Sequence, residues 1–428
     1  MLNESGRVPD TRYEWKAVTL LSLGFGLVGL DRFMVIPMFP ALVKDLGLNY
    51  QDLGHITGAL AITWGVSAIL MGRITDKIGP RKVVAGALVI FSLLAGFHGL
   101  AAGIGSLILI RALMGVFEGA YTPAAIVATL EASAPQRHGR NLGIQQAALP
   151  LFGLAVAPIL ITQLLQIIEW RTIFFLLAIP GLIIAFLLFR VLRDPVVSEI
   201  KVHTSVEPVG SGRWQEIFRY RNIPLNIANM FCWLTCLIVT SAMFPSYLID
   251  YIHLDMLQMG FVLSAIGFGA AAGTIVMPTL SDRLGRKPVM LVSVIGAIVF
   301  LIGLINVGAD PTLLFVMLFG TCFFNFSMIC LTVGPLSAES VPPQLMTTAS
   351  GMVVGIGEIF GGGIAPIVAG YVAQHFGIQY TLYLALGGLA LGFFVILALK
   401  ETAPRKLAPV VTPAEAQEAR QGMSRNSI

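Results

Sequence analysis

The chain has 428 residues, of which 56% are hydrophobic and only 12% are charged. Soluble domains carry about 25% charged residues, and a soluble fold of this length could not cover so much apolar side chain with polar groups. The composition therefore excludes an ordinary soluble protein and predicts that lipid surrounds most of the molecule. The net charge of +4 comes with no pattern typical of nucleic-acid binding.

Twelve apolar segments are long enough to cross a membrane, for which a helix needs about 20 mostly apolar residues. We therefore predict an all-α membrane protein with twelve transmembrane helices. In chain order the segments cover residues 17–40, 53–72, 83–103, 106–129, 142–165, 173–192, 223–249, 260–278, 289–307, 312–333, 347–372 and 381–399.

Polar segments divide the chain. Residues 1–16 form a polar N-terminal segment, and residues 193–222 form a central loop between two halves of six helices, 17–192 and 223–399. The tail, residues 400–428, is polar and rich in Ala, Pro and Glu, which predicts disorder.

The distribution of Lys and Arg predicts the orientation. With both termini placed on one side, 23 of the 27 basic residues lie on that side, and only Lys44 and Arg171 lie on the other. Because cytoplasmic loops carry an excess of Lys and Arg, we expect both termini in the cytoplasm and the chain in a plasma membrane, most simply a bacterial inner membrane.

A short loop motif occurs twice. GRITDKIGPRK (72–82) joins the second and third segments, and SDRLGRKP (281–288) joins the eighth and ninth, 206 residues later. An aspartate at a helix end can accept hydrogen bonds from a neighbouring helix N-terminus, and a basic pair can anchor at lipid headgroups. We predict that these loops gate the conformational change. The gating residues are Gly72, Asp76, Gly79, Arg81 and Lys82, the last four aligned with Asp282, Gly285, Arg286 and Lys287 if one extra residue is allowed in the first copy.

The twelve helices, the central loop and the duplicated loop resemble the major facilitator superfamily over the whole chain. The resemblance implies two pseudo-symmetric six-helix bundles that rock around a site near the midplane and give alternating access. It implies a secondary transporter that needs no cofactor, and we expect a monomer. The sequence contains no Walker loop, nucleophile elbow or metal-protease motif, so an enzyme is not indicated.

Four charged residues fall inside the first-half segments: Asp31, Arg32, Arg111 and Glu118. Each costs at least roughly 2.5–3.5 kcal/mol in a membrane and is usually paired or functional. Arginine keeps its charge and offers a planar fork to a carboxylate. A carboxylate in a poorly hydrated cavity takes up a proton more readily than one in water. The four residues therefore favour proton-coupled binding of an organic anion.

Asp31-Arg32, together with RALMGVFEG at 111–119, resembles the anion:cation symporter branch of the superfamily. Members of that branch move organic acids and sugar acids with protons or sodium. The resemblance implies that Asp31 and Glu118 are proton sites, that Arg32 contacts the substrate anion and that Arg111 couples them. One position departs from the branch, because Glu358 stands in GIGEIFGGGIAP (355–366), where the branch has an asparagine.

Several polar residues inside other segments are further candidates for substrate binding. With Arg32 and Arg111, the predicted substrate-binding residues are Tyr121, Gln145, Asn229, Asn325 and Glu358. The coupling ion is expected to be a proton, because no oxygen-rich sodium site is visible.

We therefore predict a proton-coupled symporter of a small organic anion, in contact with membrane lipid. The alternative is a proton-coupled antiporter that exports lipophilic or cationic compounds, which Glu358 and the 26 phenylalanines favour. A transporter-like sensor is the remote alternative, because it would normally need an added soluble domain.

Overall fold

The computed structural model describes residues 11–134, 137–193, 213–342 and 345–403. Within these ranges the chain is helical without strands, and twelve helices are long and apolar enough to cross a membrane. The predicted all-α class and the number of spans are confirmed. Most of residues 1–16, the middle of the central loop and nearly all of the tail lie outside the described residues, so the predictions made for them stay predictions.

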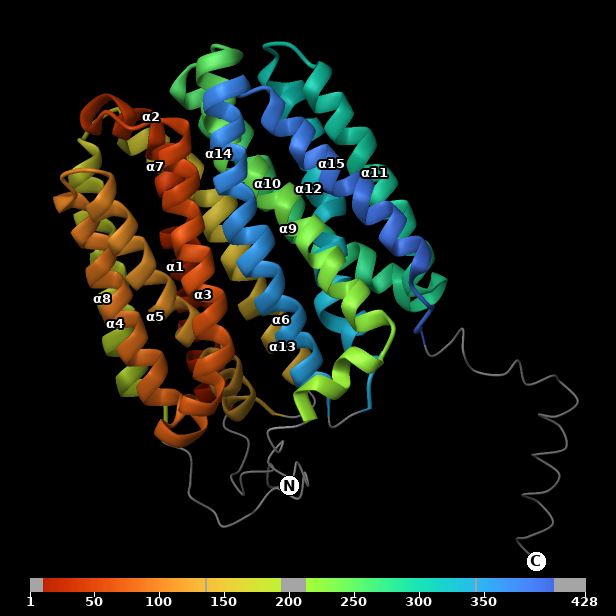
Figure 1. Ribbon diagram of the computed structural model, residues 1–428. Helices are drawn as coiled ribbons and strands as arrows, with labels where there is room; N and C mark the ends of the chain where they lie inside the picture. Colours follow the sequence, from red (N-terminus) through yellow and green to blue (C-terminus); the bar gives the residue numbers. More distant parts are fainter. Residues whose placement is uncertain (1–10, 135–136, 194–212, 343–344, 404–428) are drawn as a thin grey trace, which may run out of the picture.

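Successive spans run in opposite directions through two bundles, coloured red to yellow and green to blue in Figure 1. The first bundle contains α1 (Thr11–Phe33), α2 (Val35–Leu46), α3 (Tyr50–Ile78), α4 (Pro80–Phe97), η1 (His98–Leu100), α5 (Ile104–Ala132), α6 (His138–Pro150), η3 (Leu151–Val156), α7 (Ala157–Leu164) and α8 (Trp170–Val191). The second contains η4 (Arg213–Arg219), α9 (Asn222–Ser246), η5 (Tyr247–Tyr251), α10 (Met256–Leu284), α11 (Arg286–Asn306), α12 (Pro311–Leu331), η6 (Thr332–Leu336), α13 (Met346–Gly357), η8 (Glu358–Ile364), α14 (Ala365–Phe376) and α15 (Tyr380–Ala398).

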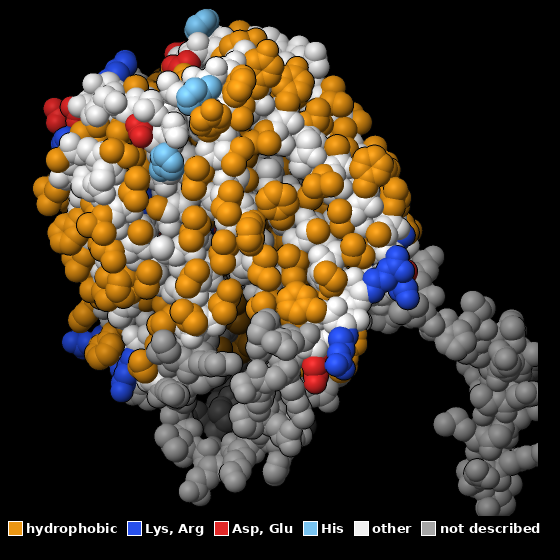
Figure 2. Space-filling view, in the orientation of Figure 1, with side chains coloured by type: hydrophobic (Ala, Val, Ile, Leu, Met, Phe, Trp, Pro, Cys, Tyr) orange, Lys and Arg blue, Asp and Glu red, His pale blue; other side chains and the backbone are white. Residues whose placement is uncertain are grey.

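We call the end where α1 begins and α15 ends the termini side, and the opposite end the far side. The termini side faces the lower edge of Figure 1. Apolar side chains cover the middle of the surface, whereas Lys and Arg gather mainly toward the termini side (Figure 2). This pattern is that of a protein whose outer surface faces hydrocarbon at mid-height and water at its ends.

Small residues allow the two halves to pack closely. A Cβ atom on Gly54 of α3 would lie 2.4 Å from the carbonyl oxygen of Pro366 in α14, and one on Gly267 of α10 would lie 2.2 Å from the backbone nitrogen of Ala155 in η3. Backbones of membrane helices approach this closely only where side chains are absent or very small. The glycines therefore set the position of the interface.

Hydrogen bonds also join the two halves on the far side. The Tyr50 hydroxyl at the start of α3 donates to Asp250 Oδ2 of η5 at 2.7 Å, and the Tyr50 N–H donates to Gln374 Oε1 of α14 at 3.3 Å. The far side is therefore held together by both packing and polar contacts.

Candidate functional site

Charged residues from both halves meet at mid-height. Arg32 in α1 donates from Nη2 to Glu358 Oε2 in η8 at 2.7 Å, with side chains only 8% and 10% exposed. The partners are 326 positions apart and belong to different halves. A buried ion pair at the boundary between the two bundles is the central feature of the site.

Aromatic rings surround the guanidinium of Arg32. Its Cζ lies 5.3 Å from the ring centroid of Trp64 in α3 and 5.6 Å from that of Phe33. Both distances are typical of cation–π contacts. The buried indole Nε1 of Trp64 has no hydrogen-bond partner among the residues described, although a buried indole N–H usually has one. Trp64 was not among the residues predicted from the sequence, where its only signal was that it is the one tryptophan of the apolar segment 53–72.

Arg111 of α5 binds backbone. Its Nη1 donates to the carbonyl oxygens of Asp31 at 2.9 Å and Arg32 at 3.1 Å, and the residue is 2% exposed. These carbonyls lie where α1 gives way to α2, close to Pro37, which has no N–H to continue the helical ladder. Arg111 thus binds the backbone of the turn that carries Asp31 and Arg32. Its predicted contact with substrate stays a prediction.

The predicted proton sites are buried without partners. Glu118 is 0% exposed, and both of its carboxylate oxygens lack a hydrogen-bond partner in the described structure; the same is true of Asp31 Oδ1. Arg32 and Arg111 both lie close enough to act electrostatically on Glu118. Buried polar atoms are nearly always satisfied in folded proteins. These oxygens therefore need a proton, water or ligand in the working protein.

The remaining candidates for substrate binding form two classes. Gln145 of α6 and Asn229 of α9 are fully buried, and neither amide has a partner for its oxygen or nitrogen within the described ranges. Tyr121 and Asn325 instead donate to backbone carbonyls in their own halves, of Leu21 at 3.2 Å and of Trp233 at 3.1 Å. Gln145 and Asn229, one from each half, are the better placed to bind a ligand.

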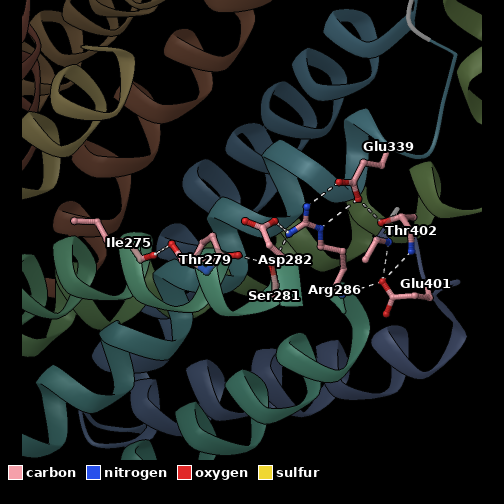
Figure 3. A network of polar contacts seen from close by, with 10 residues as sticks. Ile275, Thr279, Ser281, Asp282, Arg286, Glu339, Glu401 and Thr402 are labelled. Atoms are coloured by element: carbon pink, nitrogen blue, oxygen red, sulfur yellow. Dashed lines mark hydrogen bonds and ion pairs between the residues drawn. The ribbon is translucent and has the colours of Figure 1, made fainter. Parts of the chain in front are cut away.

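The second loop copy is the centre of a polar network on the termini side (Figure 3). Arg286 donates to Asp282 Oδ1 at 2.5 Å and to both Glu339 oxygens, at 2.8 and 3.3 Å. Glu401, just after α15, accepts from the backbone N–H groups of Arg286 at 2.8 Å and Lys287 at 3.1 Å. The network connects the α10–α11 loop to the ends of two other spans. Glu401 was not among the residues predicted from the sequence.

The first copy shares the backbone geometry of this loop. Gly79 and Gly285 both have positive φ, +92° and +105°, and both end one helix and begin the next. Arg81 donates to the carbonyl of Phe189 near the end of α8 at 2.7 Å. Lys287 does the same for Leu397 and Leu399 at the end of α15, at 2.7 and 2.9 Å.

The two copies therefore align without an inserted residue. A constant offset of 206 pairs Arg81 with Lys287 and places Pro80 opposite Arg286. This corrects the alignment that paired Arg81 with Arg286, because the backbone rather than the run of basic residues sets the register. Lys82 is exposed. The surroundings of Gly72 and the side chain of Asp76 lie outside what the structure describes, so their gating roles stay predictions.

Glu401 is held in its charged form. Burial alone would raise the pKa of its carboxyl group, but hydrogen bonds from the backbone N–H groups of Ala403, Arg286, Lys287 and Thr402 outweigh burial and keep the pKa below its usual value. The carboxylate thus acts as a permanent acceptor at the start of α11, where a helix N-terminus favours negative charge.

No group of three or more His, Cys, Asp or Glu side chains that could hold a metal ion occurs among the described residues.

Comparison with known proteins decides the family. The model of the Major Facilitator Superfamily matches residues 21–363. The chain belongs to the major facilitator superfamily. This confirms the predicted family and fold and establishes a transporter rather than an enzyme.

Curated relatives resemble the chain along most of its length. The sialic acid transporter NanX of Escherichia coli is 23% identical over 86% of this chain and 90% of its own length. The hexuronate transporter of Bacillus subtilis is 24% identical over 90% of this chain and 94% of its own. Both names fit the anion:cation symporter branch that the sequence resembles.

A solved structure has the same fold. The crystal structure of a bacterial homolog to the human lysosomal transporter Spinster, in an inward-facing and unoccupied conformation, superposes with a TM-score of 0.78. It is 16% identical and covers 91% of this chain and 98% of its own. At this identity the likeness concerns the fold alone.

Proposed function

We propose that this transporter is a proton-coupled symporter of a small organic anion that carries a carboxylate. The observation that carries the proposal is a pair of buried carboxylates. Among the described residues, neither oxygen of Glu118 has a hydrogen-bond partner, nor has Oδ1 of Asp31, and the guanidinium of Arg32 acts electrostatically on Glu118. Such carboxylates bind protons, and such a guanidinium binds an anion.

The balance of charge supports proton coupling. The site holds three carboxylates, on Asp31, Glu118 and Glu358, and two guanidiniums, on Arg32 and Arg111. With all five ionised its net charge is −1, and a bound carboxylate would make it −2. Because uncompensated charge in a poorly hydrated interior is costly, binding an anion favours simultaneous uptake of protons by the unpartnered carboxylates.

The relatives support the substrate class. A sialic acid transporter and a hexuronate transporter both carry, by name, sugars with an acid group. Fully buried amides of Gln145 and Asn229, without partners in the described residues, offer donors and acceptors for hydroxyl groups. We therefore propose that the substrate carries hydroxyl groups as well as the carboxylate.

Export of cationic compounds is less well supported. A cation would be bound by a carboxylate beside an aromatic ring. Glu358 and Trp64 are such a pair, but Arg32 contacts both of them. We further propose that the termini side faces the cytoplasm of a bacterial cell, because both named relatives are bacterial and the basic residues gather on that side.

Uptake into proteoliposomes tests the proposal. A labelled pool of organic acids is offered with and without an inward proton gradient, to wild type, Glu118→Gln and Glu131→Gln. Glu131 is the control, an exposed carboxylate near the other end of the same helix. We expect gradient-driven accumulation by wild type and Glu131→Gln, and its loss in Glu118→Gln. Accumulation that ignores the gradient, or an unaffected Glu118→Gln variant, would show that the coupling mechanism is wrong.

A further inference from the structure

Arg32 is already occupied by a carboxylate. The guanidinium that should bind the substrate anion instead binds Glu358 at 2.7 Å, in a pair shielded from water on almost all sides. The bound group is chemically the same as the group that the proposed substrate would present. Glu358 is also the residue that departs from the branch that the sequence resembles.

The local fold brings this carboxylate to Arg32. Glu358 begins η8, a π-helical segment that continues through three consecutive glycines, Gly361 to Gly363. A Cβ on Gly361 would lie 2.8 Å from the backbone of Phe231 in α9, and one on Gly363 would lie 2.4 Å from Ile62 in α3. The segment therefore lies tightly between α9 and α3. π-Helical insertions of this kind are frequent at functional sites.

An unpaired guanidinium at this depth would be unstable. Removing one partner from a buried ion pair leaves the other charge uncompensated, and this costs far more than the pair contributes. A transporter without substrate must still bring its halves together around Arg32 when it reorients. A carboxylate from the opposite half removes that difficulty, because it neutralises Arg32 whenever the site is empty.

We propose that Glu358 is a tethered stand-in for the carboxylate of the substrate: it occupies Arg32 in the empty transporter and is displaced when the anion binds. This inference rests on the proposed function and adds how the site is regulated. Glu358 competes with every substrate, so only a group that matches a carboxylate in charge and planar geometry replaces it. Neutral sugars and amides are excluded by this competition.

Chemical rescue tests the proposal without knowledge of the substrate. Glu358→Ala removes a methylene and a carboxylate, which together have the shape of acetate. We expect acetate to raise the apparent melting temperature of purified Glu358→Ala in a saturable manner, since a ligand bound only to the native state stabilises it. Acetamide, which has the same shape and no charge, should not, and wild type should respond to neither.

A second variant displaces Glu358 while it keeps its charge. A Cβ on Gly362 would lie 2.5 Å from Glu358 Oε2, whereas one on Gly351 of α13 would meet nothing within 4 Å. We expect Gly362→Ala to move the carboxylate from Arg32 and to make the protein responsive to acetate. Gly351→Ala is the matched control and should behave as wild type.

A third measurement applies if Glu358→Ala does not fold. Phenylglyoxal modifies free guanidinium groups, and peptide mass spectrometry measures the modification of Arg32. We expect several-fold more modification in Glu358→Gln than in wild type, because the amide no longer neutralises the guanidinium.

The outcomes separate this proposal from the proposed function. Equal acetate responses in wild type and Glu358→Ala, or equal reactivity of Arg32 in wild type and Glu358→Gln, would overturn the stand-in role. If acetate stabilises Glu358→Ala but no organic acid is taken up with protons, the carboxylate-binding site at Arg32 is supported and the proposed symport is contradicted. In a functional symporter, the apparent affinity for the transported acid should rise about tenfold in Glu358→Gln, equivalent to ~1.4 kcal/mol of lost competition.

Discussion

The two halves of this transporter hold equivalent loops in place with different side chains. In the second half, Arg286 joins Asp282 and Glu339, while Glu401 binds the start of α11 (Figure 3). In the first half the position of Arg286 is taken by Pro80, which begins α4 without donating an N–H. The helix geometry is retained, whereas the arginine at the centre of the second-half network is replaced by an uncharged residue.

The first half has a polar network in another place. Arg137, between α5 and α6, binds the carboxylate of Glu14 near the start of α1 through two nitrogens, Nε and Nη2. Asn141 Nδ2 donates to the same carboxylate at 2.6 Å and to Ser133 Oγ at 2.8 Å. In both halves, a glutamate near one end of the described chain, Glu14 or Glu401, binds a loop on the termini side. Duplication thus preserved the backbone geometry of the loop, although residues 80 and 286 differ in charge.

The largest difference between the halves should appear on removal of the two basic side chains. Arg286→Ala should lower the free energy of unfolding by about 3 kcal/mol, because it removes charge-assisted hydrogen bonds to both Glu339 and Asp282. Arg81→Ala should cost about 1–2 kcal/mol, because it removes a hydrogen bond to the Phe189 carbonyl and a cation–π contact with the Phe189 ring, whose centroid lies 4.8 Å from the guanidinium carbon. Unfolding of the purified variants in detergent measures both, and equal losses would contradict the asymmetry.

The two positive-φ glycines form a second matched pair. Both substitutions to alanine force an L-residue into a conformation that costs about 1–3 kcal/mol. Gly285→Ala should cost more than Gly79→Ala, because its Cβ would also lie 2.8 Å from Glu401 Oε2, whereas nothing lies within 4 Å at Gly79. Adding Glu401→Ala should recover this excess in a double-mutant cycle. If the losses of stability from Gly285→Ala and Glu401→Ala simply add, the contact between the new Cβ and Glu401 is unimportant.

Glu401 should have a smaller, pH-dependent effect. Glu401→Gln should destabilise the protein at neutral pH by about 1–2 kcal/mol through weaker hydrogen bonds to the start of α11. Because the folded-state pKa lies below the usual value of 4.5, this contribution is present above pH 4.5 and is lost as the pH falls through the folded-state pKa. The melting temperatures of wild type and variant should converge as the pH falls. A difference that grows in acid would contradict the predicted direction of the effect.

The smallest effect should come from restoring the missing arginine. Pro80→Arg places a cation at the position equivalent to Arg286, and the exposed Glu131 at the end of α5 is the carboxylate with which we test its pairing. We expect a change within about 1 kcal/mol, because an exposed ion pair contributes little and a favourable N1 proline is lost. The informative quantity is the coupling energy between Pro80→Arg and Glu131→Gln in a double-mutant cycle. A coupling energy as large as the loss expected for Arg286→Ala would mean that the two loops differ only by this residue.

Much of the fold followed from local sequence properties. The length of the apolar segments identified the twelve spans, and the duplicated loop identified the two bundles. Both signals come from residues that lie close together in the sequence. The helix ends were less well predicted: α1 already begins at Thr11, inside the segment assigned to the polar N-terminus, and η5, η6 and η8 were not expected. The alignment of the two loop copies was wrong for a related reason, since charge identity was taken as the guide to register instead of the glycine conformation.

The sequence alone determined that this is a membrane transporter of the major facilitator type, with charged residues buried in its first half. The buried charges could be identified because burying charge in lipid is costly, so each charged residue stands out from its apolar surroundings. Only the tertiary structure decided which charges meet. Arg111 binds the backbone of Asp31 and Arg32, whereas Arg32 reaches across to Glu358, 326 positions away. No local pattern encodes that contact, because it arises from the packing of η8 between α3 and α9.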